Sequence, residues 1–331
     1  MYGLSDLKNT ITVSEATVEC PVNGCNHFVP RQRKVFKRLE EFKCPEHGIF
    51  ISPSTFEYQN RLENILWKDA VDQDLLFNGI FRVKRETERI ARDNSEDAVT
   101  WNVFRYLEKQ KLLGGFLSSL TGASVDDCEV IYWSYSQSQD RGGYWNPLQQ
   151  VREEFELNPA KGSEPDLIVK ANNALFLIEA KLNASNNTVP SSKDPAFKQK
   201  YENGCQGWYN QVFQSQFDQI AVIDRKYELL RFWLLGSKMA DYLHANFYLV
   251  NLVPQEKETA IEPFFKKHIK ESSDRTFLRA TWEEIYRFIE NKGITNKEKE
   301  VITKYFAEKT VGYDKERQLQ RAFTLDIHRS S

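Results

Sequence analysis

The stretch GSEPDLIVKANNALFLIEAKL runs from Gly162 to Leu182 and holds two apolar runs, DLIVKA and ALFLIEAKL, separated by Asn172-Asn173. Short apolar runs rich in β-branched and aromatic residues are typical of buried strands. Asparagine tolerates the positive φ that a two-residue hairpin turn requires. The stretch therefore predicts an antiparallel hairpin in which Ala171 faces Ala174.

Four charged residues lie in this hairpin, and the predicted register brings them together. Asp166 falls opposite Glu179, and Glu164 falls opposite Lys181. Since side chains alternate between the two faces of a strand, all four point to one face. Like charges directly opposite destabilise a sheet, and apolar neighbours add a desolvation penalty. One carboxylate could stay protonated and relieve the repulsion. A divalent cation between Asp166 and Glu179 would also relieve it, and hard oxygen ligands suit Mg²⁺. The alternative is a solvated face with a Glu164–Lys181 ion pair.

Three of the five cysteines lie close together near the N-terminus, as Cys20-x4-Cys25 and, after eighteen residues, Cys44-x2-His47. Paired ligands of this kind suit tetrahedral zinc, and four protein ligands make a closed, structural site. His27 is a rival for the fourth position, but Cys-x2-His closes a knuckle better. Free thiols in a small core are the alternative reading.

A basic segment, PRQRKVFKRLEEFK, lies between the two ligand pairs. Interleaved positive and aromatic residues could hold a phosphate backbone, and a solvated charged face is an equally good interpretation. The positive residues are Arg31, Arg33, Lys34, Lys37, Arg38 and Lys43, of which the first five are the predicted nucleic-acid contacts.

The rest of the chain alternates helical and strand patterns. Asn94 or Ser95 is a good N-cap for a helix whose first turn contains Glu96, and acids there complement the helix dipole. Glu96 lies on the same face as the apolar stripe of that helix, which aims it towards the core. The other expected elements are a helix over 65–92, a strand over 128–138, a loop over 141–150, a mobile polar loop over 183–195, helices over 196–218 and 222–243, a strand over 246–254, and helices over 281–293, 297–309 and 316–325.

Pro165-Asp166, twelve residues and then Glu179-Ala180-Lys181 resemble the motif of the PD-(D/E)XK nuclease superfamily. The order of elements over residues 94–253 is similar to that family's core, and Glu96 matches a glutamate found on its first helix. The resemblance implies an α/β restriction-endonuclease-like fold, a mixed sheet flanked by helices.

The resemblance also implies metal-dependent hydrolysis of a phosphodiester. Asp166 and Glu179 would hold Mg²⁺ (or Mn²⁺), with Glu96 as a further ligand, and Lys181 would orient the attacking water. Glu164 would pair with Lys181 outside the minimal motif. Gln206 and Tyr209 are candidates for a glutamine and a tyrosine that some members carry, although the spacing is shorter and ordinary helix surface explains both.

These patterns divide the 331 residues into a zinc-ribbon-like module (1–56), a nuclease-like core (57–255) and a C-terminal helical extension (256–331). The net charge of −2 means that any nucleic-acid surface is a local patch. The N-terminus lacks a signal-peptide pattern and no apolar run is long enough to span a membrane, so we expect a cytoplasmic protein with no membrane partner.

The expected function is a DNA nuclease from a restriction or phage-defence setting, with a structural Zn²⁺. The alternative is an inactive nucleic-acid-binding protein on a nuclease-like fold. The sequence leaves DNA against RNA open, and it leaves open whether the C-terminal helices pack on the core or form a homodimer.

Overall fold

The computed structural model describes residues 6–325, except Lys34, Glu156 and residues 85–88, 139–141, 158–163, 192–195, 294–295 and 314–317. The chain forms two compact units built from interleaved segments. The cysteine unit comprises Met1–Asp69, Glu88–Lys109 and Thr281–Ser331, and the sheet unit comprises Ala70–Thr87 and Gln110–Ala280. This division differs from the three consecutive domains expected from the sequence.

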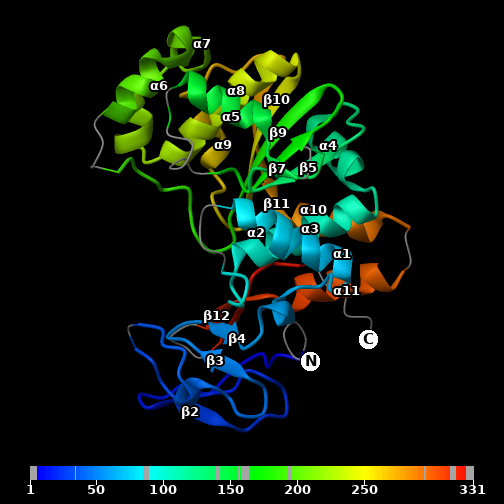
Figure 1. Cartoon of the computed structure of the whole chain (residues 1–331). Coiled ribbons are helices and arrows are strands. Elements are labelled where there is room, and N and C mark those ends of the chain that lie inside the picture. The colour runs from blue at the N-terminus through cyan, green and yellow to red at the C-terminus, as the bar shows by residue number, and fades with distance from the viewer. Residues whose placement is uncertain are drawn as a thin grey trace. The chain divides into compact units, whose positions relative to one another are not determined.

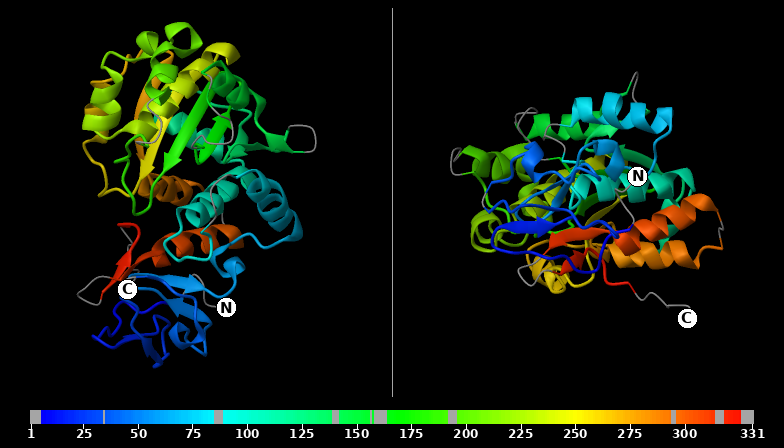
Figure 2. Two further views of the ribbon diagram at one scale, coloured as in Figure 1. Left: turned by 60° about the vertical axis from the view of Figure 1, so that its left-hand side comes forward. Right: turned by 90° about the horizontal axis from the view of Figure 1, so that it is seen from below.

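The sheet unit is built on a mixed seven-stranded sheet in the order β11-β10-β9-β8-β5-β6-β7, as the predicted α/β class requires. β9 pairs in parallel with β10, as their arrows show in Figure 2 (left), whereas the pairs from β9 to β7 are antiparallel. The strands are β5 (Glu129–Tyr132), β6 (Tyr135–Ser136), β7 (Gly143–Tyr144), β8 (Leu167–Lys170), β9 (Ala174–Ala180), β10 (Asn246–Val253) and β11 (Arg275–Thr281).

Helices flank this sheet. α8 (Tyr227–Leu243) packs on β9 and β10, and α5 (Asn146–Glu154) and α7 (Tyr209–Val212) pack against α8, as Figure 1 shows. The core beneath α8 contains Leu175, Leu177 and Leu249, which alternate with residues that face the other side of the sheet. The other helices are α1 (Ala70–Gln73), which continues through a π-helical stretch (Asp74–Ile80) into α2 (Phe81–Val83), α4 (Leu113–Thr121), α6 (Ala196–Gly207), a π-helical turn (Gln219–Ile223) and α9 (Ile261–Lys266).

The β8–β9 hairpin has the predicted register. Leu167 pairs with Ile178 and Lys170 with Leu175, and the amide of Ala171 donates to the carbonyl of Ala174 at 2.8 Å. The expected positive φ in the turn is absent, however, because neither Asn172 nor Asn173 adopts one. Instead, the Asn172 side chain donates to Asp127 at 2.8 Å, which ties the turn to the loop before β5.

The cysteine unit begins with two small antiparallel hairpins, β1 (Thr17–Glu19) with β2 (Phe28–Pro30) and β3 (Ile49–Ile51) with β4 (Phe56–Tyr58). Its helices are α3 (Glu96–Lys109), α10 (Trp282–Asn291) and α11 (Lys297–Glu308), with short 3-10 turns at Glu40–Phe42 and Arg61–Asn64. A third hairpin, β12 (Thr310–Tyr313) with β13 (Leu319–Arg321), closes it. Tyr313 donates through its amide to the carbonyl of Ser54 at 3.0 Å, so β12 lies beside the β3–β4 turn (Figure 1).

Several sequence expectations are wrong in detail. The expected loop over 141–150 contains the start of α5, since proline in the first turn of a helix sacrifices no hydrogen bond. Residues 319–321 form a strand rather than a helix, because β12 supplies a pairing edge. The expected helix over 65–92 spans only 70–83, and β11 adds a strand inside the predicted helical extension. None of the helices that the structure describes has the length and apolar content needed to cross a bilayer.

Candidate active site and metal centre

The charged residues of the β8–β9 hairpin form a cluster where β9 ends, on the face of the sheet that α8 covers. We call Asp166, Glu179, Lys181 and Glu228 the acidic cluster. Three of its members were predicted from the hairpin register, and Glu228 is added by the first turn of α8. All four lie within the sheet unit.

Asp166 comes directly before β8 and is held by two donors. The indole Nε1 of Trp133 donates to its Oδ1 at 3.1 Å, and the backbone amide of Ala180 donates to its Oδ2 at 2.8 Å. The second bond crosses from one arm of the hairpin to the other. These two hydrogen bonds fix the position of the Asp166 carboxylate beside Glu179.

Glu179 is almost fully buried, with 3% of its surface exposed. Its Oε1 accepts a hydrogen bond from Lys181, whereas its Oε2 has no hydrogen-bond partner among the described residues. A buried carboxylate oxygen without a partner carries a desolvation penalty that native structures seldom leave uncompensated. Asn251 on β10 lies beside Glu179 in the parallel register.

Lys181 lies between two carboxylates. Its Nζ contacts Glu179 and donates to Oε2 of Glu228 at 3.1 Å. Sequence reasoning missed Glu228, because it lies on a helix 47 residues further along the chain and reaches the site only through the packing of α8 on β9. The predicted helix began at residue 222, which placed Glu228 in its second turn, and an acid there gave no sign of another role.

The acidic cluster has three carboxylates and one lysine, so it carries an excess of negative charge. Burial raises the pKa of Glu179 well above its usual range, and Asp166 and Glu228 add to the shift. Burial alone would lower the pKa of Lys181, but the carboxylates of Glu179, Glu228 and Asp166 outweigh it and raise that pKa. Both shifts have one physical meaning: the cluster binds positive charge more strongly than its members do in water.

The remaining predicted residues of this site lie as follows. Glu164 accepts a hydrogen bond from the Tyr144 hydroxyl at 3.0 Å, and its pairing with Lys181 stays a prediction. Tyr209 is buried in the core, where its hydroxyl donates to the carbonyl of Ser215 at 2.9 Å and its ring stacks on Phe213. Gln206 is exposed and adopts a positive φ of 56° at a kink in α6. Gln206 therefore lies on the helix surface, as one interpretation expected, whereas the burial of Tyr209 in the core was not expected.

Glu96 belongs to the cysteine unit, where it is half-buried in the first turn of α3. Ser95 is the residue that caps this helix, because its Oγ accepts from the amide of Ala98 at 3.1 Å. Dipole complementation explains Glu96 within its own unit, and its role as a third carboxylate stays a prediction.

The polar loop after β9 is anchored over its first residues, contrary to the mobile loop expected. Asn186 is fully buried and donates to Asn251 at 2.6 Å and to Glu258 at 2.8 Å. Thr188 pairs with the segment before α8, where its Oγ1 accepts from the amide of Glu228 at 2.9 Å. The loop therefore fixes the first turn of α8 and, with it, the Glu228 carboxylate.

The predicted zinc ligands in the cysteine unit converge as expected. The ligand atoms of Cys20, Cys25, Cys44 and His47 all lie within 4.8 Å of one another. The Sγ atoms of Cys25 and Cys44 are 3.8 Å apart, and Nδ1 of His47 lies 3.6 Å from Sγ of Cys20 and 3.5 Å from Sγ of Cys44. A tetrahedral zinc site places its sulfur atoms about 3.8 Å apart and sulfur and nitrogen about 3.6 Å apart, given its usual bond lengths.

Tight turns at each ligand pair create this geometry. Gly24 and Gly48 have φ values of 76° and 64°, which glycine adopts without strain. His27, the rival ligand, pairs instead with exposed Glu46 at 3.1 Å. Burial raises the pKa of the Cys20 thiol, so this sulfur becomes a thiolate only when a cation lies beside it. The Cys₃His group could therefore hold a structural metal such as zinc.

Among the residues that the structure describes, no other group of three or more histidine, cysteine or acidic side chains has its ligand atoms this close. The three carboxylates of the acidic cluster therefore do not form such a group. Mg²⁺ commonly binds proteins through one or two carboxylates and completes its shell with water and substrate phosphate.

The basic segment is partly engaged within the cysteine unit. Arg31 donates to the carbonyl of Ser14 at 3.0 Å, and Arg33 forms an ion pair with Glu15 at 2.9 Å. Arg38 pairs with Glu57 at 3.4 Å, whereas Lys37 is exposed. Lys34 lies outside the described residues. Several of these cations therefore stabilise the fold, and the segment presents less charge to a partner than its sequence suggests.

No family model, curated protein or solved structure matches the chain.

Proposed function

We propose that this protein is a metal-dependent nuclease that hydrolyses phosphodiester bonds of DNA. The observation that carries the proposal is the unpartnered, buried Oε2 of Glu179 beside the fixed carboxylate of Asp166, in a cluster with an excess of negative charge. A divalent cation would satisfy this oxygen and balance the charge. The motif resemblance points to the same residues.

In this proposal Asp166 and Glu179 hold Mg²⁺ or Mn²⁺, and the motif resemblance names Glu96 as a further acid. The metal supplies a Lewis acid that polarises the phosphate and lowers the pKa of a bound water. Lys181 keeps its proton, because three carboxylates raise its pKa. It therefore orients the attacking water and stabilises developing negative charge, and a role as the general base is disfavoured.

Cleavage of plasmid and linear DNA with Mg²⁺ or Mn²⁺ tests the proposal, using wild type beside Asp166→Ala, Lys181→Ala and Glu96→Gln. Asp241→Asn is a matched control, since this exposed acid on α8 pairs only with nearby Lys238 among the contacts described. We expect wild type and the control to cleave, and the three site variants to lose at least about 100-fold in rate. Intact DNA with wild type and either metal would support the alternative, a nucleic-acid-binding protein without cleavage.

A further inference from the structure

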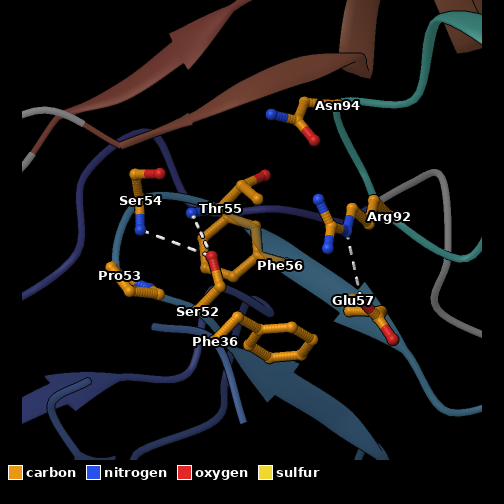
Figure 3. Close-up of a pocket in the computed structure, with 9 residues that line it drawn as sticks. All are labelled: Phe36, Ser52, Pro53, Ser54, Thr55, Phe56, Glu57, Arg92 and Asn94. Atoms are coloured by element: carbon orange, nitrogen blue, oxygen red, sulfur yellow. Dashed lines mark hydrogen bonds and ion pairs between the residues drawn. The ribbon is translucent and has the colours of Figure 1, made fainter. Parts of the chain in front are cut away.

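The cysteine unit contains a pocket of about 250 Å³ that the zinc centre and the acidic cluster do not use. Its walls come from the basic segment, the β3–β4 turn, β4 and the residues before α3. Figure 3 shows the nine lining residues, which are Phe36, Ser52, Pro53, Ser54, Thr55, Phe56, Glu57, Arg92 and Asn94.

A buried hydroxyl without a partner faces this pocket. Thr55 is 7% exposed, and its Oγ1 makes no hydrogen bond within the described part of the chain. Figure 3 shows this hydroxyl pointing into the space towards Asn94 and Arg92. A buried polar atom of this kind is normally satisfied by protein, by ordered water or by a ligand, so the hydroxyl is available to a polar ligand.

The walls of the pocket are fixed. The Ser52 hydroxyl accepts from the amide of Thr55 at 2.8 Å, which leaves its own proton available to donate. Gln32 is buried and bonds to Ile51 at 2.9 Å and to the amide of Lys37 at 2.6 Å, which holds the segment that carries Phe36. Behind the turn, a Cβ on Gly312 would lie 2.0 Å from the Ser54 carbonyl, so only glycine allows this approach.

The lining contains one cation, Arg92, and one carboxylate, Glu57, which is itself paired. Nε of Arg92 lies 3.4 Å from Glu57, whose carboxylate also pairs with Arg38 at 3.4 Å, so one glutamate faces two arginines. Figure 3 shows the terminal nitrogens of Arg92 extending into the space. The Arg92 guanidinium also lies over the half-buried Phe36 ring, 5.9 Å from its centre, so the pocket wall places a cation beside an aromatic ring.

Asn94 adds an amide at the opposite wall. Because Ser95 caps α3, the Asn94 side chain is not used as the helix cap. Asn94 follows Asp93, whose carboxylate accepts a hydrogen bond from the Tyr58 hydroxyl at 2.7 Å and whose backbone amide donates to the carbonyl of Phe56 at 2.9 Å. The pocket thus combines hydroxyls, an amide and a guanidinium with an aromatic ring.

We propose that this pocket binds one nucleotide unit, with its phosphate on Arg92 and the Ser52 and Thr55 hydroxyls and its base against Phe36. Hydroxyls and guanidinium are the donors that phosphate oxygens prefer, and aromatic faces stack on bases of any sequence. The volume exceeds what a phosphate alone requires. The inference is independent of the proposed hydrolysis, because every lining residue belongs to the cysteine unit.

Calorimetric titration of the full chain, with no added Mg²⁺ or Mn²⁺, tests this with three probes: deoxyadenosine 5′-monophosphate, inorganic phosphate and deoxyadenosine. A 5′-phosphorylated single-stranded oligonucleotide, used as competitor, distinguishes a free nucleotide from a strand end. We expect the mononucleotide to bind at least about tenfold more tightly than either phosphate or deoxyadenosine, since it contacts both the phosphate-binding residues and Phe36.

Thr55→Val removes the hydroxyl and retains the shape, and Thr100→Val is its matched control, because the Thr100 Oγ1 is also buried and unpartnered but lies outside the pocket. We expect Thr55→Val and Arg92→Gln to weaken nucleotide binding about tenfold or more, and Phe36→Leu to reduce the nucleotide affinity to that of phosphate.

Equal affinity of the Thr55→Val and Thr100→Val proteins would overturn the assignment, as would phosphate binding as tightly as the nucleotide or the absence of any heat with wild type. Cleavage of DNA by the same variants is a separate readout. Retained cleavage with lost nucleotide binding would support a binding site distinct from the acidic cluster.

Discussion

The Oδ2 atom of Asp166 accepts a hydrogen bond from the backbone amide of Ala180, 2.8 Å away on the neighbouring strand. This bond fixes Asp166 against the strand that carries Glu179 and Lys181. The carboxylate therefore has a structural role as well as its proposed catalytic one, and the two can be separated by choice of substitution.

Asp166→Asn should separate them. The amide oxygen still accepts one of the two hydrogen bonds, so we expect the melting temperature to fall by only a few degrees, whereas metal-dependent cleavage falls at least about 100-fold because an amide is a poor Mg²⁺ ligand. Differential scanning calorimetry and plasmid cleavage measure the two effects. Retained cleavage by a folded Asp166→Asn protein would remove Asp166 from the metal site.

Glu228→Gln tests the residue that sequence reasoning missed. Lys181 would lose one of its charged partners at 3.1 Å, so its ammonium would be less firmly held and its raised pKa would fall. We expect about a tenfold loss of cleavage rate and an alkaline limb of the pH–rate profile that moves to lower pH. Glu262→Gln, which removes a glutamate paired with Lys266 at 2.8 Å, is the control and should leave the profile unchanged.

Removal of metal should unfold the small hairpins of the cysteine unit. The Cys₃His group joins the connection between β1 and β2 to the segment before β3, and structural zinc contributes directly to folding free energy. We expect about one equivalent of zinc in the purified protein, and a loss of protection from proteolysis near residues 20–47 after chelation. Cys44→Ser should behave like the chelated protein. Less than about half an equivalent of zinc, with unchanged proteolysis, would contradict a structural site.

We expect the free energy of unfolding to depend on pH because of Lys309, a buried residue of the cysteine unit. Burial lowers its pKa below 10.5, against the opposing effect of Asp93. The unfolded chain therefore holds this proton to higher pH than the folded chain does, so the contribution of Lys309 to stability rises as pH rises through the lowered pKa towards 10.5.

The comparison with Lys309→Met isolates this contribution. The variant leaves Asp93 without its buried cation, so we expect it to be less stable by roughly 3–5 kcal/mol near neutral pH. Urea unfolding from pH 7 to pH 10 should show a gap between the two proteins that changes with pH. A constant gap would mean that Lys309 does not titrate differently on folding.

We expect substitutions at two residues of the basic segment to have different effects. Lys37 is exposed, and Arg31 is bound to the carbonyl of Ser14. If DNA contacts the segment, Lys37→Gln should reduce the slope of log affinity against log salt by about 1, since one phosphate contact is lost. Arg31→Gln should lower stability instead. Gel-shift titrations over a range of salt measure the slopes, and an unchanged slope for Lys37→Gln would place the segment outside the interface.

Local patterns predicted the hairpin register and the convergence of the Cys₃His group. The register of β8 and β9 followed from the strand lengths and the two-residue turn, and Cys20, Cys25, Cys44 and His47 followed from ligand spacing. In both cases, residues close in sequence determine the geometry. Glu228 and the pocket around Thr55 could not be found this way, because each is assembled from distant segments by packing. The strand β11 was missed because its burial does not alternate cleanly.

The interleaving of the two units also constrains the order in which the protein can fold during its synthesis. Thr310 donates to Asp93, and the Tyr313 hydroxyl donates to the carbonyl of Ser52 at 2.6 Å, so the earliest part of the chain is completed by some of its last residues. All segments of the sheet unit have been made by residue 280. On the ribosome, the sheet unit can therefore finish first, while the N-terminal hairpins wait for β12 to emerge.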